Sequence, residues 1–351
     1  MKIAIFLPNW LGDLVMATPT LRAMRRHFGR DARLVGILRP YLAEVLGGID
    51  WLSEQWYYDP RATDRDVRPL ALVRRMRREQ FDSVVMLTNS LRTAIVALLS
   101  GAPKRIGYVR YGRGPLLTTK LYPRRRGFRL LDSPMVDTYL ALAEAVGCGN
   151  ESPRLELATT AADELSADAV FRRLGLRNEG RLITFNSSGA YGGAKLWPAE
   201  YFARLARRVV RELDHDVLMM CGPNEREIAR QVVQLAGSPR VCSMADQPLD
   251  LGTAKACIRR GRLMVSTDSG PRHVAAAFGK PLVTLFGPML PVWGANPTQR
   301  MANVLLELDC IGCHKRVCPL GHHKCMRELT VDRVFAQVVN LLREEGPAKV
   351  A

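Results

Sequence analysis

The chain alternates short apolar stretches with amphipathic ones, and the alternation begins a second time near residue 180. Predicted strands cover residues 2–7, 33–38, 83–87, 182–185, 216–220, 241–242, 263–265 and 282–286. Predicted helices cover residues 14–28, 40–47, 69–78, 92–99, 134–146, 160–174, 198–212, 251–259 and 331–345. This order favours parallel sheets with helices on both faces. Because 351 residues exceed the size at which one core stops growing, we expect two α/β domains.

Several protein classes are excluded by composition. No apolar run approaches the ~20 residues that a membrane-spanning helix needs. The N-terminal apolar stretch is short and lacks a small-residue cleavage site, so it is interpreted as a first strand, not as a signal peptide. We therefore expect a cytoplasmic protein whose eight cysteines are thiols or metal ligands.

The positive charge is concentrated in the first half of the chain. Residues 1–150 hold 24 Lys and Arg against 13 Asp and Glu, a net of +11, whereas the remaining residues have a net of +6. Such a balance suggests a polyanionic partner, namely nucleic acid, an acidic membrane surface or a phosphorylated carbohydrate. Solvated arginine-rich faces are the alternative. The chain has no nucleic-acid-binding motif, so nucleic acid is not expected as a partner.

A strand, a polar turn and an Ala-rich helix follow one another at residues 263–279. Pro271 suits the first turn of that helix, since its φ is fixed and it lacks an N–H. Free N–H groups and the positive end of the helix dipole can bind a phosphate or sugar phosphate there. The alternative is an ordinary N-cap by Asp268 or Ser269 without a ligand.

Two further turns carry polar groups at predicted strand ends. Asp13 follows the first strand and could remove a proton from an attacking hydroxyl, or could simply be an N-cap or first-turn acid. A Gly- and Ser-rich loop at residues 186–195 ends in Lys195. Its N–H groups and the lysine could bind phosphate oxygens, or the loop could be flexible and the lysine solvated. Neither turn has the spacing of a dinucleotide-binding or P-loop motif.

Together these motifs resemble the ADP-heptose:lipopolysaccharide heptosyltransferases, which are glycosyltransferases of family 9 with the GT-B fold. The resemblance rests on Asn9-Trp10-Leu11-Gly12-Asp13, on the Gly-Ala…Ala-Lys-Leu-Trp-Pro loop at 189–198, and on Thr267-Asp268-Ser269-Gly270 followed by His273. Leu-Thr-Asn-Ser at 87–90 and Arg-Ile-Gly-Tyr at 105–108 are similar to the family's acceptor-domain segments. The similarity runs to about residue 345, and heptosyltransferase II is the most similar subgroup.

The resemblance implies two facing Rossmann-like domains with a C-terminal crossover helix. Residues 1–165 would bind the acceptor, residues 166–330 would bind the ADP-sugar, and residues 331–351 would return to the first domain. The implied reaction is an inverting, metal-independent transfer of heptose from ADP-L-glycero-β-D-manno-heptose to the heptosyl-Kdo-lipid A inner core of lipopolysaccharide. Another nucleotide sugar or acceptor, and a non-catalytic basic protein on a GT-B scaffold, stay open as alternatives.

The resemblance also implies roles for individual residues. Asp13 would be the catalytic base. Donor-binding residues would be Ser187, Ser188, Gly189, Lys195, Asp268, Ser269, Gly270 and His273. Acceptor-binding candidates are Asn9, Trp10, Gly12, Asn89, Ser90, Arg110 and Arg113, with Arg124, Arg125 and Arg126 as further basic candidates. The expected partner is a lipid A–Kdo–heptose acceptor at the anionic inner leaflet, met by a monomer peripherally associated with the inner membrane.

Four cysteines, Cys310, Cys313, Cys318 and Cys325, lie within 16 positions. That density predicts a structural zinc site or, as a second choice, an iron–sulfur cluster. The alternative is a loop of reduced thiols without a metal. The other four cysteines, Cys148, Cys221, Cys242 and Cys257, are expected to fill the core.

Overall fold

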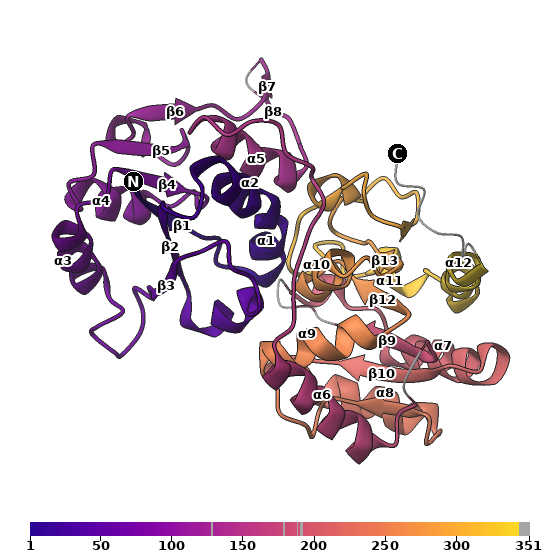
Figure 1. Cartoon of the computed structure of the whole chain (residues 1–351). Helices are drawn as coiled ribbons and strands as arrows, with labels where there is room; N and C mark the ends of the chain where they lie inside the picture. Colours follow the sequence, from indigo (N-terminus) through magenta and orange to yellow (C-terminus); the bar gives the residue numbers. More distant parts are fainter. Residues whose placement is uncertain (128, 178–179, 188, 190–191, 344–351) are drawn as a thin grey trace. The chain divides into compact units, whose positions relative to one another are not determined.

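The computed structural model describes residues 1–343 except residues 128, 178, 179, 188, 190 and 191. The chain divides into two compact α/β units (Figure 1). The first unit comprises Met1–Ala158 and Val292–Pro297, and the second comprises Thr159–Pro291 and the chain from Thr298 onward. Each contains a six-stranded parallel sheet with helices on both faces, as the alternating sequence pattern predicts. Among the described residues, no helix is both long and apolar enough to cross a membrane.

The first sheet has the strand order β3-β2-β1-β4-β5-β6. Its strands are β1 (Lys2–Phe6), β2 (Arg33–Leu38), β3 (Glu54–Tyr57), β4 (Ser83–Met86), β5 (Lys104–Tyr108) and β6 (Thr119–Leu121). Its helices are α1 (Leu11–Met16), α2 (Thr18–Phe28), α3 (Pro69–Glu79), α4 (Leu91–Leu99) and α5 (Met135–Glu144), with 3-10 helices η1 (Pro40–Leu46) and η2 (Gly114–Leu116). Ala4 and Phe6 of β1 pack in the core cluster under α3 and α4. Both faces of these central strands are buried, and their sequences are correspondingly apolar throughout.

The second sheet has the order β11-β10-β9-β12-β13-β14. Its strands are β9 (Leu182–Asn186), β10 (Asp216–Met220), β11 (Val241–Ser243), β12 (Leu263–Thr267), β13 (Leu282–Leu285) and β14 (Met301–Val304). Its helices are α6 (Ala161–Leu174), α7 (Ala199–Leu213), α8 (Arg226–Ala236), α9 (Leu251–Arg260), α10 (Gly270–Ala277), α11 (Lys324–Arg327) and α12 (Val331–Arg343), with η3 (Gly193–Lys195), η4 (Pro223–Glu225) and η5 (Pro291–Gly294).

The strand order reverses once in each sheet, between β1 and β4 and between β9 and β12. In open parallel sheets, ligands bind in the crevice beside the carboxyl ends of the two strands at such a switch point. The predicted site residues follow these strands. The fold therefore places one candidate site in each unit.

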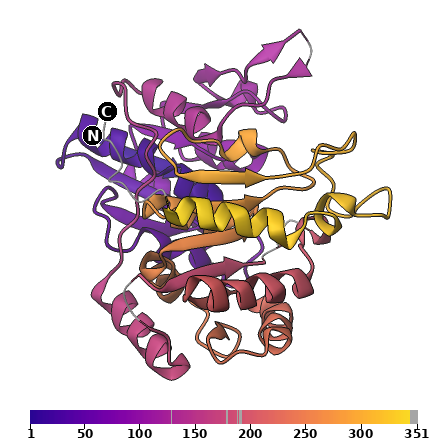
Figure 2. The ribbon, with the colours of Figure 1, turned by 90° about the vertical axis from the view of Figure 1, so that its right-hand side faces the viewer.

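The last helix, α12, packs on α7, β13 and β14 of the second unit (Figure 2). The return of residues 331–351 to the first domain stays a prediction. Val334, Phe335 and Val338 of α12 belong to the core cluster of that unit, because its apolar stripe covers the sheet there. Residues 344–351 lie outside the described part of the chain.

Some boundaries also differ from the predictions. The two units divide at Ala158 and Thr159, before the expected boundary at 165, since Thr160 and Asp163 form a capping box that starts α6, and α6 packs on α9. The region at 105–129, to which the sequence assigns no strand or helix, contributes most of β5, all of β6, and the antiparallel pair of β7 (Arg125–Arg126) with β8 (Arg129–Leu130).

Candidate functional site

A pocket of about 490 Å³ lies at the switch point of the first sheet. Its walls come from the segments that follow β1 and β4 and from α5. It is lined by Pro8, Asn9, Trp10, Asp13, Leu87, Thr88, Asn89, Ser90, Leu91, Tyr111, Met135 and Tyr139. Five predicted residues, Asp13, Asn9, Trp10, Asn89 and Ser90, are thus brought together here.

The carboxylate of Asp13 is held in this pocket by Tyr139. Asp13 lies in the first turn of α1, where the helix dipole favours an acid. It is not the N-cap, which is Trp10. The hydroxyl of Tyr139 donates a hydrogen bond of 3.0 Å to Oδ1 of Asp13. Burial and the neighbouring Asp13 charge raise the pKa of Tyr139 well above its usual value, so the phenol stays a proton donor.

Arg113 is not among the residues that line the pocket. Its side chain is fully buried, and its guanidinium donates to the carbonyl oxygens of Tyr108 and Thr88 and, at 3.0 Å, to Oδ1 of Asn89. Burial, with Arg110 nearby, lowers the pKa of Arg113 to about 10. The arginine holds the segment after β4, because its five donors suit several backbone oxygens at once.

The remaining acceptor candidates lie around this pocket or apart from it. Gly12 is buried in α1, directly before Asp13. Arg110 is partly exposed in the loop after β5, next to Tyr111, which does line the pocket. Arg124, Arg125 and Arg126 are partly or fully exposed at the hairpin. These arginines are not among the residues that line the pocket.

In the second unit, Asp268 connects the turn after β12 with two cations. Nζ of Lys195 lies 2.7 Å from Oδ2 of Asp268 and donates to its carbonyl oxygen at 2.8 Å. The buried Arg272 binds Oδ1 through Nε at 3.0 Å and through a terminal nitrogen at 2.9 Å. Burial opposes ionisation of Asp268, yet the charges of Arg272 and Lys195 lower its pKa. The carboxylate is therefore ionised, and the loop at 192–195 is tied to the turn.

The first turn of α10 receives no hydrogen bond from the side chain of its N-cap residue. Ser269 is the N-cap residue but makes no side-chain cap hydrogen bond. Its hydroxyl instead accepts a 2.7 Å hydrogen bond from Asn186, the last residue of β9. Gly270 begins the helix, and Pro271 lies in its first turn as predicted. First-turn N–H groups that no cap uses are suited to an anionic ligand.

Two buried polar atoms near this turn have no hydrogen-bond partner within the described part of the chain, Oγ of Ser187 and Nδ1 of His273. Burial, together with the charge of Arg272, lowers the pKa of His273 well below its usual value, so its imidazole is neutral. Unpaired buried polar groups are costly, and a bound ligand would relieve that cost. The predicted Ser188 lies outside the described residues.

Glu225 connects the turns after β9 and β10. Its carboxylate accepts hydrogen bonds from the N–H of Gly222 at 2.8 Å and of Gly189 at 3.3 Å. The predicted donor residue Gly189 therefore offers its N–H to a carboxylate in this structure. A ligand at this edge would meet that acid as well as the Lys195 loop.

The cysteine segment contacts the Lys195 loop. Among the described residues, no group of three or more His, Cys, Asp or Glu side chains is arranged to hold a metal ion, so the zinc prediction finds no support. Cys310, Cys313, Cys318 and Cys325 are partly buried free thiols. The segment instead contacts Ala194, whose N–H donates to the Arg316 carbonyl at 3.0 Å and whose carbonyl lies 2.7 Å from Nε2 of His323.

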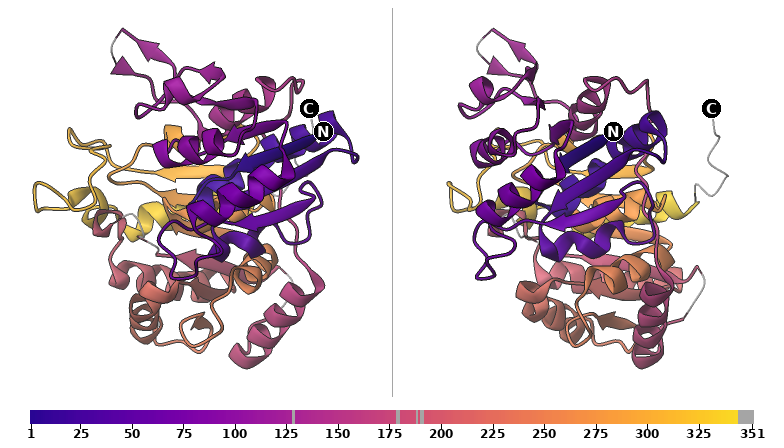
Figure 3. Two further views of the ribbon diagram at one scale, coloured as in Figure 1. Left: turned by 90° about the vertical axis from the view of Figure 1, so that its left-hand side faces the viewer. Right: turned by 60° about the vertical axis from the view of Figure 1, so that its left-hand side comes forward.

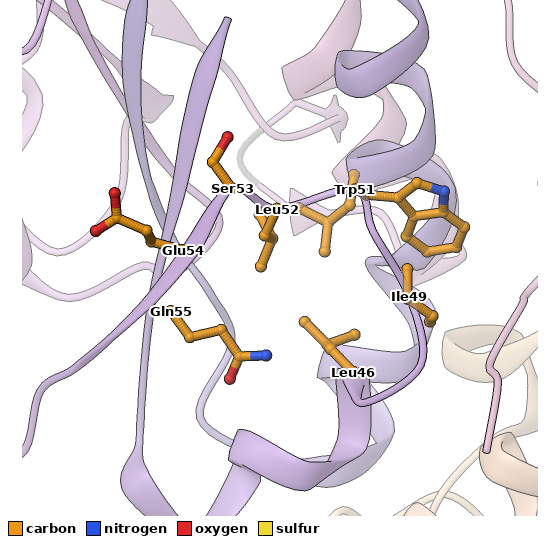
Figure 4. A pocket seen from close by; sticks show the side chains of 8 residues that line it. Leu46, Ile49, Trp51, Leu52, Ser53, Glu54 and Gln55 are labelled. Carbon is orange, nitrogen blue, oxygen red and sulfur yellow. The ribbon is translucent and has the colours of Figure 1, made fainter. Parts of the chain in front are cut away.

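A smaller pocket of about 190 Å³ lies in the first unit away from these residues (Figure 4). Leu46, Ile49, Trp51 and Leu52 line it, just before β3. It contains none of the predicted site residues and lies at the amino end of β3, opposite the edge where parallel sheets bind ligands. We do not assign it to the site.

Sequence reasoning missed five residues that complete the two sites: Tyr139, Tyr111, Asn186, Arg272 and Glu225. Arg272 had a usable signal, since it is four residues from Asp268 across a helix start. Tyr139 had none, because 126 positions separate it from Asp13.

Comparisons with known proteins identify the family of this chain. A profile of glycosyltransferase family 9 (heptosyltransferase) matches residues 69–324. Lipopolysaccharide heptosyltransferase 2 of Salmonella typhimurium (strain LT2) is 26% identical over 99% of this chain and 100% of its own.

Two solved structures share the fold. The structure of E. coli ADP-heptose lps heptosyltransferase II has a TM-score of 0.77 and 23% identity, covering 99% of this chain and 100% of that one. A family 9 glycosyltransferase from Veillonella parvula DSM 2008 has a TM-score of 0.81 and 23% identity, covering 98% and 97%. Because the family profile spans most of the sequence, this chain belongs to glycosyltransferase family 9, the heptosyltransferase family.

Proposed function

We propose that the protein transfers heptose from ADP-L-glycero-β-D-manno-heptose to the heptosyl-Kdo-lipid A inner core of lipopolysaccharide, with inversion at the anomeric carbon. The observation that carries the proposal is the carboxylate of Asp13, fixed by Tyr139 in a pocket at the switch point of the first sheet. Membership of family 9 and the names of the curated relatives support the donor and acceptor class.

On the acceptor side, Asp13 acts as the general base. It takes the proton from an acceptor hydroxyl while that oxygen forms a bond to the anomeric carbon of the donor. Asn9, Trp10, Asn89 and Ser90 provide an amphipathic pocket wall, suited to a sugar that offers hydroxyls and a C–H face. Gly12 lies in α1 beside the base, and Arg113 holds Asn89 through a 3.0 Å hydrogen bond.

On the donor side, the bond between the anomeric carbon and the diphosphate oxygen breaks, and negative charge develops on ADP. The start of α10 at Ser269 and Gly270, together with Lys195, stabilises that charge, so no divalent metal is required. Asp268 binds sugar hydroxyls, and Ser187, Ser188, Gly189 and His273 complete the donor site.

We propose that the protein works at the cytoplasmic face of the inner membrane. Lipid A is anchored in the bilayer, whereas ADP-heptose is soluble, and the excess of basic residues in the first half favours an anionic surface. We propose peripheral attachment of a monomer.

The test is product analysis with ADP-heptose and a truncated Kdo-heptose acceptor in the presence of excess EDTA. We expect one added heptose with inverted configuration and a rate that EDTA does not change. UDP- and GDP-sugars serve as the comparison panel. Faster turnover of a UDP- or GDP-sugar than of ADP-heptose would show that ADP-heptose is not the donor. Wild-type biological activity of the Asp13→Asn variant would refute the proposal that the protein is a transferase.

A further inference from the structure

The outward face of α4 is apolar. Its exposed residues are Leu91, Arg92, Ile95, Leu98 and Leu99, and each of the four aliphatic side chains is more than 40% exposed. They recur at helical spacing and so form one stripe, here called the α4 stripe. The inward face of α4 already packs in the core of the first unit. Because surface helices normally turn polar residues outward, the stripe indicates an interaction surface.

Arginines flank the α4 stripe. Helix α3 packs beside α4, and Nε of Arg77 donates a 2.7 Å hydrogen bond to the carbonyl of Leu99. Arg74 and Arg78 are exposed on the same side of α3 as Arg77. Figure 3 (left) looks onto the face of the first sheet that carries both helices. The aliphatic stripe thus has a basic border.

The chain from β4 to residue 131 carries no compensating acid, and Glu79 and Asp82 are the acids just before it. Residues 83–131, which include α4, contain ten Lys and Arg and no Asp or Glu. Lys104, just after α4, is exposed as well. The positive charge therefore favours an anionic partner. The aliphatic stripe favours a partner that also has an apolar interior.

The stripe begins at the Asp13 pocket. Leu91, its first residue, lines that pocket next to Ser90 and Asn89. If α4 lies on a bilayer, the polar part of a molecule anchored in that bilayer therefore lies beside the pocket.

We propose that the α4 stripe and the α3 arginines dock the protein on the surface of an anionic phospholipid bilayer. The four aliphatic side chains enter the boundary between headgroups and acyl chains, while Arg74, Arg77 and Arg78 pair with lipid phosphates. Nucleic acid would satisfy the arginines but leave the aliphatic stripe in water. Binding to the bilayer does not depend on heptose transfer. The purpose of this binding, which is to bring a lipid-linked acceptor to the pocket, rests on the proposed function.

The experiment is co-sedimentation of the full chain with phosphatidylglycerol-containing vesicles and with neutral phosphatidylcholine vesicles. We expect binding to the anionic vesicles that weakens in high salt. The double variant Ile95→Glu with Leu98→Glu should bind about tenfold more weakly, since it places two acids in the apolar stripe. The pair Arg74→Gln with Arg78→Gln should bind more weakly and lose part of the salt dependence.

Leu165→Glu is the matched control, because Leu165 is 68% exposed on α6 of the second unit. It should sediment like the unmodified protein, and unchanged thermal unfolding should show that the variants fold. Equal sedimentation of the α4 variants and the native chain would overturn the proposal. A native dimer that the α4 double variant converts to a monomer, with vesicle binding unchanged, would also overturn it.

The vesicles contain no acceptor and the assay no nucleotide, so the result does not depend on transfer. Failed heptose transfer with retained sedimentation would refute the proposed function alone. Conversely, the α4 double variant should keep full turnover on a soluble, lipid-free acceptor.

Discussion

The phenol of Tyr139 donates a 3.0 Å hydrogen bond to the carboxylate of Asp13, across 126 positions of sequence. Tyr139 is almost fully buried, so this bond fixes the orientation of a group that α1 alone would leave free to rotate. Asp13→Asn should lower kcat on the order of 10² to 10⁴-fold, the usual contribution of a general base. Titration with ADP should give an unchanged Kd.

Tyr139→Phe tests the positioning role, because it removes the hydroxyl and keeps the packed ring. We expect kcat to fall about tenfold while KM for the donor stays unchanged, as for a lost hydrogen bond to a charged group. The control is Tyr122→Phe, since Tyr122 is 69% exposed. An equal effect of both variants, or a change confined to donor KM, would contradict the role.

Lys195→Ala should weaken ADP binding about tenfold, because it removes a charge-assisted contact to the diphosphate. Isothermal titration at two salt concentrations measures the effect, and the variant should show a smaller salt dependence than the native chain. Lys120→Ala, at an exposed lysine of β6, is the control. Unchanged affinity in Lys195→Ala would exclude a diphosphate contact.

His323→Ala should weaken ADP binding about threefold, since Nε2 of His323 contacts the carbonyl of Ala194 and thereby holds the Lys195 loop. The neighbouring His322 provides a matched comparison, because its Nδ1 accepts a local hydrogen bond from the N–H of Lys324, two residues along the chain. His322→Ala should leave ADP affinity unchanged. Similar affinities for the two variants would show that the cysteine segment does not support the loop.

Glu164→Gln tests how pH affects the packing of α6 on α9. Although burial opposes ionisation, hydrogen bonds from Arg259, Thr159 and Arg260 lower the pKa of Glu164 to about 2. A carboxyl whose folded pKa is depressed stabilises the fold above its unfolded pKa of 4.5 and loses that contribution as pH falls toward 2. The native chain should therefore be more stable than the variant at pH 7 by about 1 to 3 kcal/mol.

That difference should shrink as the pH is lowered from 4.5, which urea unfolding at a series of pH values measures. Glu200→Gln, at an exposed position of α7, is the comparison. A difference between native and Glu164→Gln proteins that does not depend on pH would show that the arginines do not stabilise the ionised carboxylate.

The central strands and the turns that follow them could be predicted because their signal is local. An apolar run such as residues 263–265, followed by a polar turn and Pro271, indicates a buried strand and a helix start without reference to the rest of the chain. The short edge strands β3, β6 and β14 were missed. Apart from Trp56 and Val304, their residues are partly buried or exposed, so their composition differs little from that of loops.

The candidate site was predictable as far as it lies next to those turns. Asp268 directly follows β12, Asp13 lies in the first turn of the helix after β1, and Lys195 ends the loop between β9 and α7. Tyr139 and Glu225 reach the sites from other elements, and sequence spacing does not record such contacts. Arg113 was an acceptor candidate because it lies in a basic region of the first half, whereas the structure buries it against three oxygen acceptors. Four closely spaced cysteines likewise suggested a metal that the described geometry does not support.

The buried guanidinium of Arg113 joins the ends of two neighbouring strands, through Thr88 and Asn89 after β4 and Tyr108 at the end of β5. One wall of the Asp13 pocket is therefore rigid before any sugar arrives. Because this wall loses little conformational entropy when a ligand binds, less of the free energy of the acceptor's contacts is offset by ordering the protein. A lysine at position 113 could not bridge the same three oxygens in one plane, and the pocket would have to be ordered anew at each encounter.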